Sequence, residues 1–136
     1  MNREYREKLS HLYDLYSLAR IEGDATEQEQ RYIQKIAEHL GVTNTDLESV
    51  ANDSLVLDFT PPKHEFECIP QFHRMLLLLS LHRRWSPMVR AYCRDMALRM
   101  GLNLLAVEEI FHMMEEQPRR GPTPDQISKV FKKYYN

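Results

Sequence analysis

The sequence predicts an all-α fold, a single bundle of about six to seven helices. Two observations predict it. Apolar residues recur with the 3.6-residue period of a helix along most of the chain, and no stretch alternates as a strand would. Only 4 of the 136 residues are glycine, and three of these stand where helices are expected to stop or turn. Because 43% of the residues are apolar, the chain can bury a core, and we expect one domain over residues 1–136.

Three helices are expected in the first half of the chain. The first ends near Ile21, and its apolar face consists of Leu9, Leu12, Tyr13, Tyr16 and Ala19. Thr26 is the expected N-cap of a second helix, which Gly41 ends. A short third helix follows and carries Leu47, Val50 and Ala51.

A connection over residues 53–70 separates the two halves. Residues 53–62 break the helical period, and Pro70 limits any helix before it to a short turn over residues 63–68. The most apolar helix of the chain is therefore expected to begin only at Gln71 and to continue to Arg83.

Three more helices follow in the second half. Ser86 and Pro87 are a cap and a first helical residue, and their helix is expected to reach Gly101. Its inward residues are predicted to be Met88, Ala91, Tyr92, Met96 and Met100. The next helix spans about residues 103–117, and a C-terminal helix spans about residues 123–135, capped by Thr123.

The two halves of the chain resemble each other at an offset of 60 residues. Thr26 aligns with Ser86 and Gly41 aligns with Gly101, as do many apolar positions between and around them. We infer a duplicated unit of three helices, with repeat one at about residues 9–52 and repeat two at about residues 71–117. Two copies are too few for a solenoid, so we expect them to form one bundle with pseudo-twofold symmetry.

The charge of the chain differs between these halves. The net charge of −2 is the sum of −6 over residues 1–60, with 6 basic and 12 acidic side chains, and +4 over residues 61–136, with 12 basic and 8 acidic. The near-neutral total disfavours a general nucleic-acid-binding protein. The split is sharpest between the acidic turn at residues 21–29 and its counterpart at residues 81–89.

The acidic turn has two interpretations. Glu22, Asp24, Glu27 and Glu29 lie within eight residues beside a helix N-terminus, and such a cluster of carboxylate oxygens suits a hard cation such as Ca²⁺ or Mg²⁺. Alternatively, Thr26 and Glu29 form a capping box, in which each side chain bonds the backbone N–H of the other residue.

The basic turn and the helix after it are the candidate partner-binding site. Arginine beside an exposed tryptophan is a common composition of protein-binding hot spots, and it also suits an anionic ligand. The alternative is a solvated face on which the tryptophan is packed. The candidate residues are Arg83, Arg84, Trp85, Arg90 and Arg94.

The stretch from Leu18 to Glu29, followed by Ile33, Ile36, Ala37 and Gly41, resembles the core signature of TerB-like domains. This family is named for the tellurite-resistance protein TerB, and a related domain occurs in a membrane-anchored DnaJ-type co-chaperone. Glu22 stands where the family usually has Asp. The resemblance implies a bundle of about seven helices, a role in stress responses as a partner of other proteins, and a cation site at Glu22, Asp24 and Glu29.

No motif for an active site is present, and we do not expect an enzyme. The first hypothesis is a protein-binding module of the TerB-like kind, with a divalent cation at the acidic turn. The second is a domain that binds an anionic ligand or nucleic acid through its basic C-terminal half, although the acidic half opposes nucleic acid. The two cysteines, Cys68 and Cys93, and the absence of an apolar N-terminal segment predict a cytoplasmic protein without membrane insertion. A homodimer is compatible with halves of opposite charge.

Overall fold

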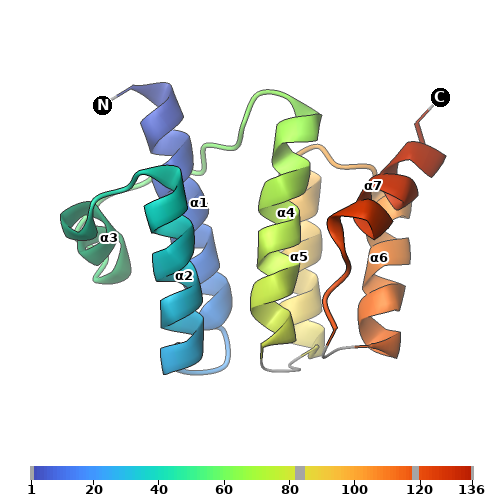
Figure 1. The fold of residues 1–136 in the computed structure, drawn as a ribbon, viewed down its shortest axis with the longest axis horizontal. Coiled ribbons are helices and arrows are strands. Elements are labelled where there is room, and N and C mark those ends of the chain that lie inside the picture. Colours follow the sequence, from blue (N-terminus) through green and yellow to red (C-terminus); the bar gives the residue numbers. More distant parts are fainter. Residues whose placement is uncertain (1, 82–84, 118–119, 136) are drawn as a thin grey trace. The chain divides into compact units, whose positions relative to one another are not determined.

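The computed structural model describes residues 2–81, 85–117 and 120–135, and this part of the chain contains seven helices and no strand (Figure 1). The all-α expectation is therefore confirmed. The helices are α1 (Arg3–Ala19), α2 (Glu27–Leu40), α3 (Asn44–Ala51), α4 (Glu65–Ser80), α5 (Pro87–Arg99), α6 (Leu104–Glu116) and α7 (Pro124–Lys133). They form two compact units, one of α1 to α3 ending at Pro62 and one of α4 to α7 beginning at Lys63. One domain over residues 1–136 stays a prediction.

In the first unit, α1 packs against both α2 and α3. Asn2 caps α1, since its side-chain oxygen accepts a hydrogen bond of 2.8 Å from the backbone N–H of Tyr5. The Tyr5 hydroxyl donates to the Asp46 carboxylate on α3 at 2.5 Å, and the Arg20 guanidinium donates to the Ala51 carbonyl at 2.7 Å. These bonds join the two ends of α3 to α1.

The second helix begins and ends where the sequence predicts. Thr26 is the N-cap of α2, and Gly41 follows its last residue in the left-handed conformation with a φ of 77°. A side chain at Gly41 would be strained in that conformation, so the glycine is needed there.

The connection after α3 is non-helical up to His64. It is held to α1 by two hydrogen bonds, from the Thr60 N–H to the Ser10 hydroxyl at 2.9 Å and from the Arg3 guanidinium to the Pro61 carbonyl at 3.2 Å. The prediction that residues 53–62 interrupt the helical pattern is confirmed.

The expected helix start at Gln71 is wrong, because α4 begins at Glu65 and continues through Pro70. Proline removes one intrahelical hydrogen bond, the one to the carbonyl four residues earlier. The buried residues Cys68 and Phe72 lie on either side of Pro70 on α4. Since most helical stability in proteins comes from packing of an apolar face, this burial outweighs the local cost.

The second unit contains helices α4 to α7, with α5 packed on α6, α6 on α7 and α4 on α7. Ser86 caps α5 and Pro87 is its first residue, as expected. The predicted inward face of α5 is partly wrong. Met88 is 61% exposed and Ala91 is exposed, whereas Val89, which is not among the predicted inward residues, is buried. Of the other predicted inward residues, Met96 and Met100 are buried.

The caps and starts of two pairs of helices follow the predicted spacing of 60 residues. Helices α2 and α5 begin at Glu27 and Pro87, and α3 and α6 begin at Asn44 and Leu104. Gly101 has a φ of 76°, close to the 77° of Gly41. The duplication and its pseudo-twofold axis stay a prediction.

None of the helices in the described part of the chain is both long and apolar enough to cross a membrane.

Candidate functional site

The acidic turn forms the predicted capping box. The Thr26 N–H donates to the Glu29 carboxylate at 2.9 Å, and the Glu29 N–H donates to the Thr26 hydroxyl at 3.2 Å. Glu29 is buried, whereas Glu22 and Asp24 are exposed in the turn before the cap. Within the described residues, no three His, Cys, Asp or Glu side chains are grouped so that they would hold a metal ion. The capping box is confirmed, and the cation site stays a prediction.

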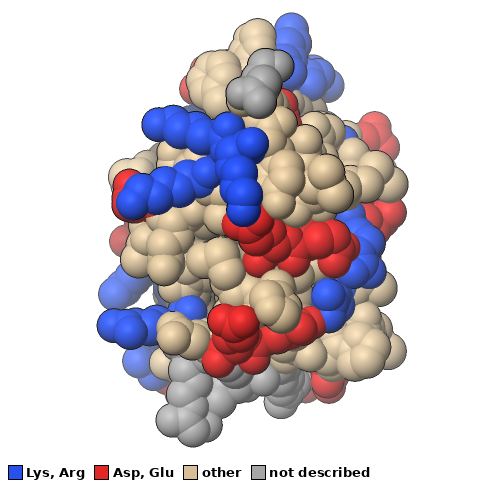
Figure 2. Space-filling model, turned by 90° about the vertical axis from the view of Figure 1, so that its right-hand side faces the viewer, with Lys and Arg blue, Asp and Glu red and all other residues tan. Residues whose placement is uncertain are grey.

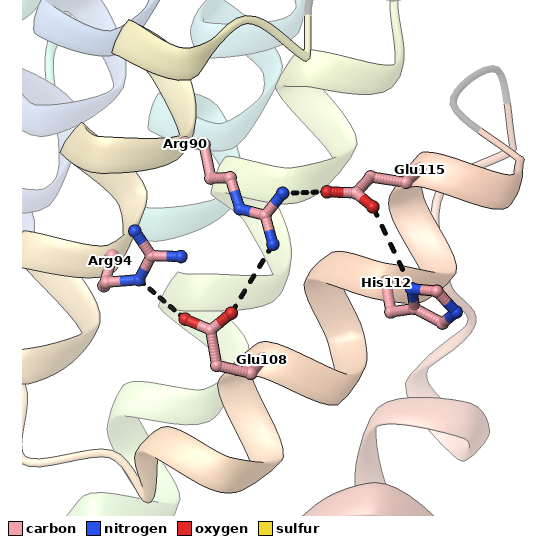
Figure 3. Close-up of polar contacts among 5 residues, drawn as sticks. All are labelled: Arg90, Arg94, Glu108, His112 and Glu115. Atoms are coloured by element: carbon pink, nitrogen blue, oxygen red, sulfur yellow. Dashed lines mark hydrogen bonds and ion pairs between the residues drawn. The ribbon is translucent and has the colours of Figure 1, made fainter.

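Three of the five candidate partner-binding residues lie in the described part of the chain, and Arg83 and Arg84 lie outside it. Arg90 and Arg94 on α5 point toward α6, where each forms an ion pair (Figure 3). Arg94 Nε donates to Glu108 Oε1 at 2.6 Å, and Arg90 Nη2 lies 3.5 Å from Glu108 Oε2. Arg90 also pairs with Glu115.

This network extends to the end of α6. His112 Nδ1 lies 3.9 Å from Glu115 Oε2, and its Nε2 lies 3.1 Å from Glu116 Oε1. Arg90 and Arg94 thus face the carboxylates of Glu108 and Glu115 on α6. Both arginines are therefore paired with carboxylates within the protein.

The same contacts shift the pKa values of the partners. The hydrogen bond from Arg94 lowers the pKa of Glu108, and Arg90 adds to this effect. In return, the hydrogen bond to Glu108 raises the pKa of Arg94. Both shifts favour the charged forms.

Phe111 on α6 lies beneath these arginines. Its ring centre is 5.7 Å from the Arg90 guanidinium carbon and 5.6 Å from that of Arg94. Trp85 packs edge-on against the same ring, with ring centres 4.9 Å apart and planes at 67°. Trp85 is therefore packed against α6, which agrees with the alternative interpretation of this residue as part of a packed face.

Charges of both signs are mixed on the surface of the second unit. The face drawn in Figure 2 carries Lys and Arg side chains beside Asp and Glu side chains. On α7, Lys129 pairs with Asp125 at 3.2 Å, and Lys133 pairs with Glu109 of α6 at 3.0 Å. Among the described residues of this half, carboxylates thus lie beside these basic side chains.

A groove between α4 and α7 is a further candidate site, and the sequence did not predict it. The two helices pack on each other in the second unit (Figure 1). The groove has a volume of about 590 Å³, within the range typical of ligand pockets, and its surface is mostly apolar. It is lined by Phe66, Ile69, Pro70, His73 and Arg74 of α4 and by Pro124, Ile127, Ser128, Phe131, Lys132 and Tyr135 of α7 and the residues after it.

Two features hold the segment before α7 against α4. His73 Nε2 lies 2.7 Å from the Pro122 carbonyl oxygen, within hydrogen-bond distance. Gly121 lies so close to α4 that a Cβ atom there would be 2.7 Å from Leu77 Cδ2. These contacts, with the buried Ile127 and Phe131, position α7 along the groove.

The groove presents large apolar side chains that the core does not cover. Phe66 is 70% exposed and Tyr135 is 41% exposed, while Ile127 and Phe131 are buried. Exposed apolar residues that border a pocket mark an interaction site more strongly than isolated ones do.

The sequence interpretation missed this groove because it began the helix at Gln71. With α4 beginning at Glu65, Phe66, Ile69 and His73 occupy positions one turn apart on one helix. A signal was present, since this stripe continues the helical period across Pro70.

Comparison of the chain with protein-family models, with curated proteins and with solved structures finds no match.

Proposed function

We propose that this protein is a non-enzymatic interaction module that binds an apolar segment of a protein partner in the groove between α4 and α7. The observation that carries the proposal is the apolar groove itself, with Phe66 at its edge at 70% exposure. Aromatic side chains at the edge of a pocket gain most when a partner covers them, and such residues dominate the energetics of protein interfaces.

A non-enzymatic role agrees with the state of the thiols. Burial raises the pKa of Cys93 to about 12, so this thiol stays protonated and is a poor nucleophile. Cys68 is buried as well. The resemblance of residues 18–41 to TerB-like domains also favours a module that acts through partners, in a stress response such as tellurite resistance.

The alternative, an anionic ligand or nucleic acid bound by the basic half, has less support. Arg90 and Arg94 would have to give up their ion pairs with Glu108 and Glu115 before they could bind an external anion. Cation binding at Glu22, Asp24 and Glu29 is not part of the proposal, because the Glu29 carboxylate already caps α2.

The proposal is tested by selecting peptides of about 16 residues from a random display library on the full chain, a length that covers a groove between two helices. The affinity of the selected peptides is then measured for the wild type and for two variants. Phe66→Ser removes the exposed aromatic ring of the groove. Leu105→Ser is the matched control, since Leu105 is 65% exposed on α6 and does not line the groove.

We expect Phe66→Ser to weaken binding by about tenfold or more, as at an interface hot spot, and Leu105→Ser to leave it unchanged. A library that yields no binder, or binders that ignore Phe66→Ser, would contradict the proposal.

A further inference from the structure

The charged side chains of the groove suggest which kind of partner segment it takes. The lining includes the cations Arg74 and Lys132, and none of the described residues that line it is Asp or Glu. Lys129 and Lys133, the other lysines of α7, pair with Asp125 and Glu109. The exposed Lys132 therefore gives this apolar groove a positive charge, and an occupant of complementary charge is apolar and acidic.

The secondary structure around the groove indicates the form of this occupant. The described part of the chain contains no strand, so a peptide finds no sheet edge to extend. A groove between two helices suits a third, amphipathic helix, whose anchors follow the i, i+3, i+4 and i+7 positions. Helix α7 has 10 residues, which corresponds to about 15 Å and to a partner helix of about three turns.

We propose that the groove between α4 and α7 binds an acidic amphipathic helix of a protein partner, with its apolar face on Phe66, Ile69 and Tyr135 and its carboxylates near Lys132. This inference rests on the proposed function and adds the charge and the conformation of the partner segment.

The test compares two synthetic helical peptides with the same apolar anchors. One carries Glu and the other carries Lys at the positions beside the anchors. Binding of each labelled peptide to the full chain is measured by fluorescence anisotropy at low and at high salt. We expect the Glu peptide to bind about tenfold more tightly at low salt, and we expect this preference to shrink at high salt as charges are screened.

Two charge variants locate the preference. Lys132→Glu places a carboxylate in the groove. It is expected to lower the affinity for the Glu peptide by about threefold or more and to raise the affinity for the Lys peptide. Lys35→Glu is the control, because it changes the net charge equally at an exposed position of α2 that does not line the groove. We expect it to change neither affinity. A version of the Glu peptide with a central proline, which breaks the helix, is expected to lose binding.

The outcomes separate this inference from the proposed function. Equal binding of both peptides, abolished in both by Phe66→Ser, would overturn the acidic preference and leave the groove as a binding site. A proline peptide that binds as well as its parent would overturn the helical conformation alone. A Glu peptide that does not bind, or whose binding Phe66→Ser leaves unchanged, would overturn the inference. The proposed function is then tested separately by the selection of peptides from the random library.

Two other occupants give distinct results. Dodecanoate that binds more tightly than the Glu peptide, and that Phe66→Ser releases, would assign the groove to a lipid. If the chain alone sediments as a dimer and the Phe66→Ser variant sediments as a monomer, the groove would be assigned to a second copy of the chain. Either result would overturn the acidic helix as the occupant.

Discussion

Phe111 on α6 is the residue around which the aromatic and basic side chains of the second unit gather. Trp85 packs on its ring from before α5, and Arg90 and Arg94 lie over it at 5.7 and 5.6 Å. An arginine that stacks on an aromatic ring and pairs with a carboxylate gives up much of its freedom to bind an external ligand. At this site the arginines therefore join α5 to α6.

The Glu108 carboxylate should make the free energy of unfolding depend on pH in the acidic range. Its pKa is lowered in the folded protein, first by Arg94, so its contribution is present above the pKa of the unfolded chain and is lost as pH falls through the folded pKa. We expect Glu108→Gln to lower the free energy of unfolding at pH 7 by less than about 1 kcal/mol, since the side chain is 42% exposed. The difference from the wild type should shrink toward pH 3.

Urea unfolding at pH 7, 5 and 3 measures this difference. Glu48→Gln, at an exposed position of α3, is the control and should match the wild type at each pH. A Glu108→Gln variant whose deficit stays constant down to pH 3 would show that the charge of Glu108 contributes nothing.

The cap of α2 is a second effect of single residues. Thr26→Ala removes the hydroxyl that accepts the Glu29 N–H bond, and we expect it to lower the free energy of unfolding by about 1 kcal/mol. Thr26→Ser keeps the hydroxyl and should stay close to the wild type. If urea unfolding gives the same free energy of unfolding for the Ala and Ser variants, the role of the cap is contradicted.

At the scale of the element, α7 is held by a narrow apolar face. Ile127, Val130 and Phe131 are buried, and the rest of the helix is largely exposed. Thr123 and Gln126 form a capping box that begins the helix next to the groove. The residue at which α7 begins is thus determined by neighbouring residues in the sequence, while the position of the helix depends on its contacts with α4 and α6.

Ile127→Ala should therefore destabilise the protein and disturb the groove. The side chain is 1% exposed, and we expect a loss of about 2–4 kcal/mol in the free energy of unfolding from the lost burial and the cavity. Ser128→Ala, one position along on the exposed face, should change it by less than about 0.5 kcal/mol. Thermal unfolding followed by circular dichroism compares them, and similar midpoints for the two variants would contradict the packing of α7.

At the scale of the whole molecule, the boundary between the two compact units coincides with the boundary in charge. The units meet in sequence at Pro62 and Lys63, and the net charges on either side are −6 and +4. The sequence predicts one domain over the chain, and the division into two units raises the alternative that each folds alone.

We expect a fragment of residues 63–136 to be helical and to unfold cooperatively without the first unit, because it contains its own buried residues and chains of this size fold alone. Circular dichroism during urea unfolding measures this. A fragment without helical signal would show that the chain folds only as the single domain that the sequence predicts.

The sequence by itself determined the helices and most of their ends. The caps Thr26, Ser86 and Thr123 and the stop at Gly41 were all predicted, because a cap depends on residues within one helical turn. The capping box at Glu29 was predicted for the same reason.

Only the tertiary structure decided which candidate residues face a neighbouring helix of the same chain and where a groove remains between helices. Arg90 and Arg94 meet Glu108 because α5 packs on α6, and Phe66 lines a groove because α4 continues through Pro70 and α7 packs beside it. These contacts join residues far apart in the chain, so their energy is absent from any local pattern. For this reason the sequence predicted the helices, and packing between them determined the candidate site.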